Sequence, residues 1–267
     1  MPTEAASGVV TIGWLQLALA SGFILLTGAL TYAVGARLEK DLAVAALRTY
    51  LQLLALGFVL RWVFANDYPL IVLAILGLMM LTATRIILGR APDAPAGLFG
   101  STLLAMALTG VTVTFAVTGL VVGVRPWWRA QYVIPIAGMV IGNSMTGIAL
   151  VLERVFADLD ARRDAILALT ALGATPWEAA RDSVRSAIRA GLIPTINSMA
   201  AVGIVFIPGM MTGQVLAGVD PLVAAPYQIV VMLMVSAATA LGAVSAVLLS
   251  FRRRFSAEGV YLERGRR

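Results

Sequence analysis

Residues 168–197, ALTALGATPWEAARDSVRSAIRAGLIPTIN, form the one long polar segment with helical spacing in a chain that is otherwise mostly apolar. Apolar runs of membrane length lie on both sides of it, at about 132–152 and 191–217. Because charged side chains are costly in hydrocarbon, this segment is expected outside the bilayer, where it can contact another protein. The apolar runs around it predict an all-α, polytopic transmembrane helical bundle.

The centre of this segment has the pattern of one helix ending and another beginning. Gly173 follows a helical pattern over 158–172 and suits a C-cap. Thr175 suits the N-cap of the next helix and Pro176 its first position, while Glu178 completes a capping box with Thr175. The sequence therefore predicts two short helices that meet at a Gly-Ala-Thr corner.

The second of these helices is amphipathic. Its charged residues recur at spacings of three, four and seven along one face, and small or apolar residues occupy the other face. The charged residues are Glu178, Arg181, Asp182, Arg185 and Arg189, and the others are Trp177, Ala180, Val184 and Ile188. Two interpretations stay open: a solvated helix stabilised by its own ion pairs, or a helix that presents one face to a partner.

Several stretches resemble the FetB-type permease family. They are LGATPWEAARDSVRSAIRAGLIPTINSM at 172–199, GIVFIPGMMTGQVLAG at 203–218, GMVIGNSMTGIALVLERV at 138–155 and RTYLQLLALGFVL at 48–60. The similarity covers most of the chain, from about 37 to 261. Members of that family are membrane subunits of bacterial ABC transporters associated with iron export, and plant relatives are linked to aluminium tolerance.

In ABC permeases a short cytoplasmic helix with an LGA-type corner docks into a groove of the ATPase subunit. The resemblance therefore implies that the ATPase-coupling residues are Leu172, Gly173, Ala174, Thr175, Pro176, Trp177, Glu178, Arg181, Asp182 and Arg185. It also implies a homodimer in the bacterial cytoplasmic (inner) membrane, exporting iron or another metal ion. ATP and Mg would be bound by the partner ATPase, so this chain is expected to hold no cofactor and to be no enzyme.

The composition agrees with a membrane subunit that lacks its own nucleotide site. The chain is 60% hydrophobic and 13% charged, far from the balance of a soluble domain. It contains no GxxxxGK[ST] loop, and its 267 residues leave little room for an ATPase domain beside the spans. We predict a single transmembrane permease domain over 1–267, with a cytoplasmic coupling segment at 153–190.

Histidine and cysteine are both absent, which excludes imidazole and thiolate metal sites as well as disulfides. The net charge of +6 is distributed as membrane topology requires and does not indicate a nucleic-acid partner. With the N-terminus outside, seventeen of the twenty basic residues fall in cytoplasmic loops and the C-terminal tail, and only Arg61, Arg125 and Arg129 fall outside. This bias predicts a cytoplasmic C-terminus.

Seven apolar segments predict about seven spans. They cover approximately 11–34, 46–64, 70–88, 98–122, 132–152, 191–217 and 225–251. The sixth is expected to be interrupted at Pro194 and Pro208. The residues before the second span, from Arg37, form either a separate helix along the membrane surface or an extension of that span.

All acidic residues lie outside the predicted centres of the spans. A carrier driven by protons or sodium usually needs an ionisable group at membrane depth, so their absence favours energy from a separate subunit. A stand-alone carrier or channel remains the alternative. The same absence leaves no carboxylate site for a metal ion at depth, and the metal-binding residues stay unassigned.

Polar, proline and methionine residues at membrane depth are the candidates for a translocation pathway. They are Asn143 and Ser144 in the fifth span, and Asn197, Ser198, Pro208, Met210, Met211, Thr212 and Gln214 in the sixth. Hydrogen-bonding groups in hydrocarbon face other helices or water, and a Pro-Gly break frees backbone carbonyls. The alternatives are helix packing, a tolerated kink and adaptable methionine packing.

Acidic and basic residues alternate just before the polar segment. The acids are Glu153, Asp158, Asp160 and Asp164, and the interleaved bases are Arg154, Arg162 and Arg163. This pattern favours a solvated helix whose charges pair with one another over a patch that collects cations.

Overall fold

A computed structural model of the chain describes residues 12–262. Thr11, the predicted start of the first span, lies outside these residues, as do three of the basic tail residues, Arg264, Arg266 and Arg267. Within 12–262 the chain is helical and contains no β-strand, which confirms the all-α prediction. The structure contains no membrane, so the orientation of the chain across the bilayer, with its C-terminus in the cytoplasm, stays a prediction.

Six helices are long and apolar enough to cross a bilayer. They are α1 (Trp14–Ala33), α2 (Glu39–Asn66), α3 (Pro69–Gly89), α4 (Phe99–Ala116) with its π-helical continuation η1 (Val117–Val121), α5 (Ala130–Ala161), and α9 (Pro221–Ser250) with the 3-10 turn η2 (Phe251–Arg254). Each corresponds to one of the predicted spans. The polytopic helical architecture is therefore confirmed.

The remaining predicted span, 191–217, is not one helix. Its first part belongs to α7 (Pro176–Ala201) and its last part is α8 (Gly209–Leu216), with a non-helical linker between them. Gly203 adopts a φ of 80° in this linker, and its N–H donates to the carbonyl of Phe206 at 2.9 Å. The predicted break at Pro208 is present, whereas Pro194 lies inside α7 without ending it.

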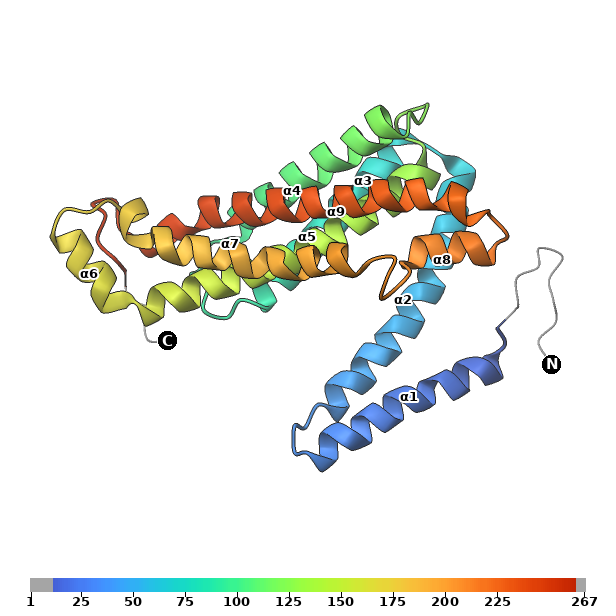
Figure 1. Cartoon of the computed structure of the whole chain (residues 1–267), viewed down its shortest axis with the longest axis horizontal. Coiled ribbons are helices and arrows are strands. Elements are labelled where there is room, and N and C mark those ends of the chain that lie inside the picture. The colour runs from blue at the N-terminus through green and yellow to red at the C-terminus, as the bar shows by residue number, and fades with distance from the viewer. Residues whose placement is uncertain (1–11, 263–267) are drawn as a thin grey trace. The chain divides into compact units, whose positions relative to one another are not determined.

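Clustering of contacts divides the described chain into two compact units, and the predicted single domain stays a prediction. Unit 1 comprises residues up to Asn66 together with Gly209–Ala225, and unit 2 comprises Asp67–Pro208 and the residues from Pro226 onward. In unit 1, α1 and α2 form a helical hairpin (Figure 1). Ser21 and Tyr50 share a hydrogen bond of 2.7 Å between their hydroxyl oxygens.

The chain from Glu39 to Asn66 is one continuous helix, so the residues before the second span extend that span and form no separate surface helix. No residue of α1 is buried. A helix that is apolar on all sides and buries none of them is suited to contact with lipid or another membrane helix.

In unit 2, α5 packs against α3, α4 and α7, and α5, α7 and α9 run beside one another (Figure 1). The helices α5 and α7 approach one another closely at Gly147 of α5 and Gly191 of α7. A Cβ atom added at Gly191 would lie 2.2 Å from a methyl carbon of Val151 and 3.0 Å from the carbonyl oxygen of Gly147. One added at Gly147 would lie 2.5 Å from the methyl of Thr239 on α9. Only glycine allows this crossing of α5 and α7.

Candidate functional site

The corner before α7 begins where α6 (Arg163–Ala171) ends. Gly173 adopts a φ of 91°, a conformation that side chains with a Cβ rarely adopt. Its N–H donates to the carbonyl of Thr170 at 3.1 Å, and the N–H of Ala174 donates to that of Leu169 at 3.0 Å. These two bonds form a Schellman motif, so the predicted C-cap at Gly173 is confirmed.

The helix predicted over 158–172 is divided in the structure. Residues up to Ala161 extend α5, Arg162 has a non-helical conformation, and α6 starts at Arg163. The coupling segment predicted at 153–190 therefore begins inside α5. Its first two turns belong to the membrane helix.

The start of α7 has the predicted capping box. The N–H of Glu178 donates to the hydroxyl oxygen of Thr175 at 3.3 Å. In return, the N–H and hydroxyl of Thr175 donate to one carboxylate oxygen of Glu178 at 2.8 and 2.7 Å. These bonds stabilise the charged form of Glu178 and lower the pKa of its carboxyl group. Pro176 occupies the first position of the helix, as predicted.

The prediction that the second helix is short is wrong, because α7 continues for 26 residues to Ala201. The helix is unbroken up to Val202. Gly191 does not interrupt it, and instead packs closely against α5. Of the predicted apolar face, Ala180 and Val184 are buried and Ile188 is half-buried, and the buried residues also include Ser183 and Ala187. The corner is therefore the end of a helix that continues into the packed centre of unit 2.

The corner presents both apolar and charged side chains to its surroundings. Leu172 is 87% exposed, more than any other exposed large hydrophobic residue of α6, α7 and the corner between them. Trp177 is partly exposed, and its ring packs edge-on against Phe251 at 5.7 Å between centroids. Arg181, Asp182 and Arg185 are all exposed. A single exposed leucine is common on protein surfaces, so the exposure of Leu172 leaves the corner accessible and does not by itself show a partner.

The residues after α9 form a feature that the sequence reasoning missed. Residues 254–262, which we call the C-terminal hairpin, fold back on themselves. The N–H of Leu262 donates to the carbonyl of Arg254, and the N–H of Ser256 donates to that of Val260, both at 2.8 Å. The rings of Phe255 and Tyr261 are buried and pack edge-on at 5.6 Å. The one available signal of this hairpin in the sequence is the pair of aromatic residues Phe255 and Tyr261, which are separated by five residues that include Gly259.

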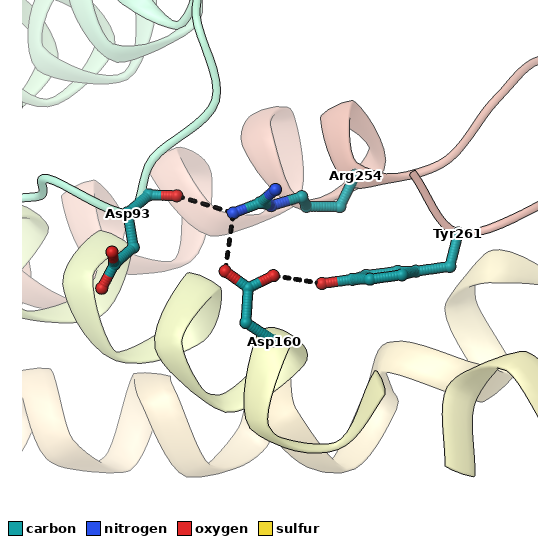
Figure 2. A network of polar contacts seen from close by, with 4 residues as sticks. All are labelled: Asp93, Asp160, Arg254 and Tyr261. Carbon is teal, nitrogen blue, oxygen red and sulfur yellow. Dashed lines mark hydrogen bonds and ion pairs between the residues drawn. The ribbon is translucent and has the colours of Figure 1, made fainter. Parts of the chain in front are cut away.

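A partly buried polar network fixes this hairpin (Figure 2). The Arg254 guanidinium donates to a carboxylate oxygen of Asp160 and to the carbonyl oxygen of Asp93, both at 2.8 Å. The hydroxyl of Tyr261 donates to the other carboxylate oxygen of Asp160. Burial and the nearby Asp160 carboxylate raise the pKa of the Tyr261 hydroxyl above its ordinary value, so it stays protonated. We call these four residues the Asp160 network.

The predicted local pairing of charges around Asp160 is therefore wrong for this residue. Its partner, Arg254, is 94 residues away in sequence, and the side chain of Arg254 is only 4% exposed. Arg162, which lies between α5 and α6, likewise pairs with a distant residue, Asp182 of α7, at 3.6 Å. Spacing along one helix could not reveal either contact, because both partners come from other elements.

An open cleft of about 600 Å³ lies between the corner and the C-terminal hairpin. One side is formed by residues of α6 and the corner, from Leu167 to Pro176, and the other by Glu258, Gly259 and Val260. The two sides come near one another at Gly259, where an added Cβ would lie 3.5 Å from the ring of Pro176.

The pathway candidates do not form one group within either unit. In unit 2, Asn143 is exposed and its amide donates to the carbonyl of Met139 at 2.8 Å. Ser144 is fully buried, and Asn197 and Ser198 are exposed on α7. The linker that ends at Pro208 leads to unit 1, where α8 carries the other four: Met210, Met211, Thr212 and Gln214. Their role in translocation stays a prediction.

Among residues 12–262, no three or more His, Cys, Asp or Glu side chains are grouped so that they could hold a metal ion. The metal site thus stays unassigned, as it was from the sequence.

The fold and the corner define a polytopic helical membrane protein. The chain belongs to the family described as "Uncharacterised protein family (UPF0014)", whose model matches residues 14–255. It is 36% identical to "UPF0014 membrane protein slr1647" of Synechocystis over 93% of this chain and 96% of that protein.

Two further relatives have more specific names. The chain is 32% identical to "Probable iron export permease protein FetB" of Escherichia coli, over 90% of this chain and 92% of that protein. It is 35% identical to "Protein ALUMINUM SENSITIVE 3" of Arabidopsis thaliana, over 85% of this chain and 82% of that protein. No solved structure matches the chain. These relatives confirm the family resemblance inferred from the sequence.

Proposed function

We propose that this protein is the membrane subunit of an ABC transporter, energised by a separate cytoplasmic ATPase that binds ATP and Mg. The observation that supports this most directly is the corner between α6 and α7. It is capped on both sides, exposes Leu172, and lies at the end of a helix that reaches the packed centre of unit 2. The coupling surface comprises residues 172–178 with Arg181, Asp182 and Arg185.

Movement of the ATPase would be transmitted along α7. Because a side chain larger than glycine does not fit where α7 crosses α5, a push at the corner displaces both helices together. A homodimer with two ATPase subunits in the inner membrane would couple two such displacements to a change of access. The pathway candidates at Asn143, Asn197 and Ser198 lie on these moving helices.

The proposed cargo is iron or another metal ion, moved outward. The printed name of the Escherichia coli relative supports this cargo. The ion is substrate here, and candidate ions can be compared by their stimulation of ATP hydrolysis by the complex.

Copurification tests the proposal. We expect the protein, tagged at its C-terminus and extracted gently from native membranes, to bring down an ATPase whose hydrolysis rate exceeds that of the ATPase alone. Charge reversal of Arg185→Glu should lower this stimulation, because Arg185 lies on the exposed face of α7. Arg90→Glu, at an exposed arginine after α3 and outside the predicted coupling segment, is the matched control. Transport by the protein alone in nucleotide-free vesicles would contradict the proposal and support a stand-alone carrier.

A further inference from the structure

The C-terminal hairpin presents a preformed surface next to the corner. Its backbone bonds and the Asp160 network hold it in place, and Gly259 lies near the ring of Pro176 at the start of α7. Ordering a flexible segment during binding costs free energy, so a surface that is already ordered binds a partner more tightly. A partner that docks at the corner would meet the hairpin without having to order it.

The hydroxyl groups of the cleft are already bonded within the chain. The Thr170 hydroxyl contacts the carbonyl oxygens of Ile166 and Leu167 at 3.1 and 3.0 Å, and the Thr175 hydroxyl is engaged by Glu178. They therefore contribute little to recognition of a partner. The groups left for recognition are a carboxylate and apolar surface.

Glu258 is the one charged residue among those described residues that line the cleft. Its carboxylate is exposed and accepts a hydrogen bond from Ser256, which lowers the pKa of the carboxyl group and keeps it ionised. Val260 beside it is 52% exposed, and Leu172 stands at the corner. This combination is complementary to an apolar side chain that has an arginine or lysine next to it.

We propose that the C-terminal hairpin is a second docking element for the ATPase subunit. In this arrangement the ATPase places an apolar side chain in the cleft and pairs an adjacent arginine or lysine with Glu258. The inference rests on the proposed function and adds the hairpin, and the chemistry of the docked segment, to the coupling surface.

The affinity of the full-length protein for its purified ATPase tests this in lipid nanodiscs. Removing one partner of a charge-assisted pair should weaken binding about tenfold in Glu258→Gln, and reversal in Glu258→Lys should weaken it further. Asp41→Lys, also at an exposed acidic residue but outside the cleft and the predicted coupling segment, should bind as the unchanged protein does.

A labelling experiment gives a second readout that does not depend on Glu258. Because the chain has no cysteine, Val260→Cys introduces a single thiol at the cleft. Saturating ATPase should slow its reaction with a soluble maleimide at least about tenfold. Arg125→Cys, an exposed position in the loop at the opposite end of α5, should react at the same rate with and without the ATPase.

The outcomes separate the two proposals. If the unchanged protein binds no ATPase, the proposed function fails. If it binds the ATPase but Glu258→Lys binds equally well and the Val260→Cys thiol stays reactive, the corner docks alone and the hairpin inference is overturned. Weaker binding of Glu258→Lys together with protection of the thiol supports it.

Discussion

Unit 2 is held together differently at its middle and at the end that carries the corner. Where α5 and α7 cross, contact depends on the absence of side chains at Gly147 and Gly191. Near the corner, contact depends on polar groups, with Arg254 bonded to Asp160 and Asp93. The crossing tolerates no added atom, whereas the corner and its hairpin can open when a few hydrogen bonds are lost. The difference suits the proposed coupling function, in which a rigid α7 would transmit movement from an end that is held by polar contacts.

The first prediction breaks the crossing. Gly191→Ala should destabilise unit 2 by about 3 kcal/mol, at the upper end of the cost of overpacking, because the new methyl group overlaps Val151 and approaches the carbonyl oxygen of Gly147. Thermal unfolding in detergent micelles measures this. Gly142→Ala on α5 is the control, since a Cβ there meets nothing within 4 Å. Equal stability of the two variants would show that the crossing has room to relax.

The two helices that form the crossing could be predicted only in part from the sequence. The apolar runs predicted α5, and the pattern of Thr175, Pro176 and Glu178 predicted the start of α7 because caps are local. The sequence pattern does not show that α7 runs without a break through Gly191 into the predicted sixth span, since a glycine in a helical pattern can mark either a weak point or a packing contact. Only the neighbouring helix decides between these two readings.

The Asp160 network could not be predicted from the sequence for a related reason. Asp160 was assigned to local ion pairs because arginines follow it closely, yet its partner is Arg254, placed beside it by the packing of α9. Arg254 was counted with the basic tail residues that set membrane orientation. A buried arginine and an exposed one look alike in sequence, and only tertiary structure separates them.

The second prediction removes the hydrogen bonds that hold the C-terminal hairpin near the corner. Arg254→Ala should cost about 2 kcal/mol, since it removes hydrogen bonds to a carboxylate that is only 30% exposed. The loss should be local: hydrogen exchange in residues 254–262 should accelerate while α5 stays protected. Asp182→Ala breaks the exposed pair with Arg162 and should cost less than about 0.5 kcal/mol. If both variants behave alike, the Asp160 network does not hold the hairpin.

The third prediction concerns the corner itself and has the smallest expected effect on stability. Thr175→Ala removes the N-cap hydroxyl of α7 and should cost about 1 kcal/mol, which accelerates hydrogen exchange in the first turn of α7 about fivefold. Thr175→Ser keeps the hydroxyl and is the matched control.

The Thr175→Ala variant also distinguishes a corner that transmits movement from a corner that only binds the ATPase. The Thr175 hydroxyl points to Glu178 within the capping box, so its loss loosens the first turn of α7 and leaves the exposed side chain of Leu172 in place. If the corner transmits force, Thr175→Ala should lower the stimulation of ATP hydrolysis more than it lowers the affinity for the ATPase. If affinity and stimulation fall together, the corner acts only as a binding surface. The rigidity that α7 gains from its crossing with α5 would then serve stability alone.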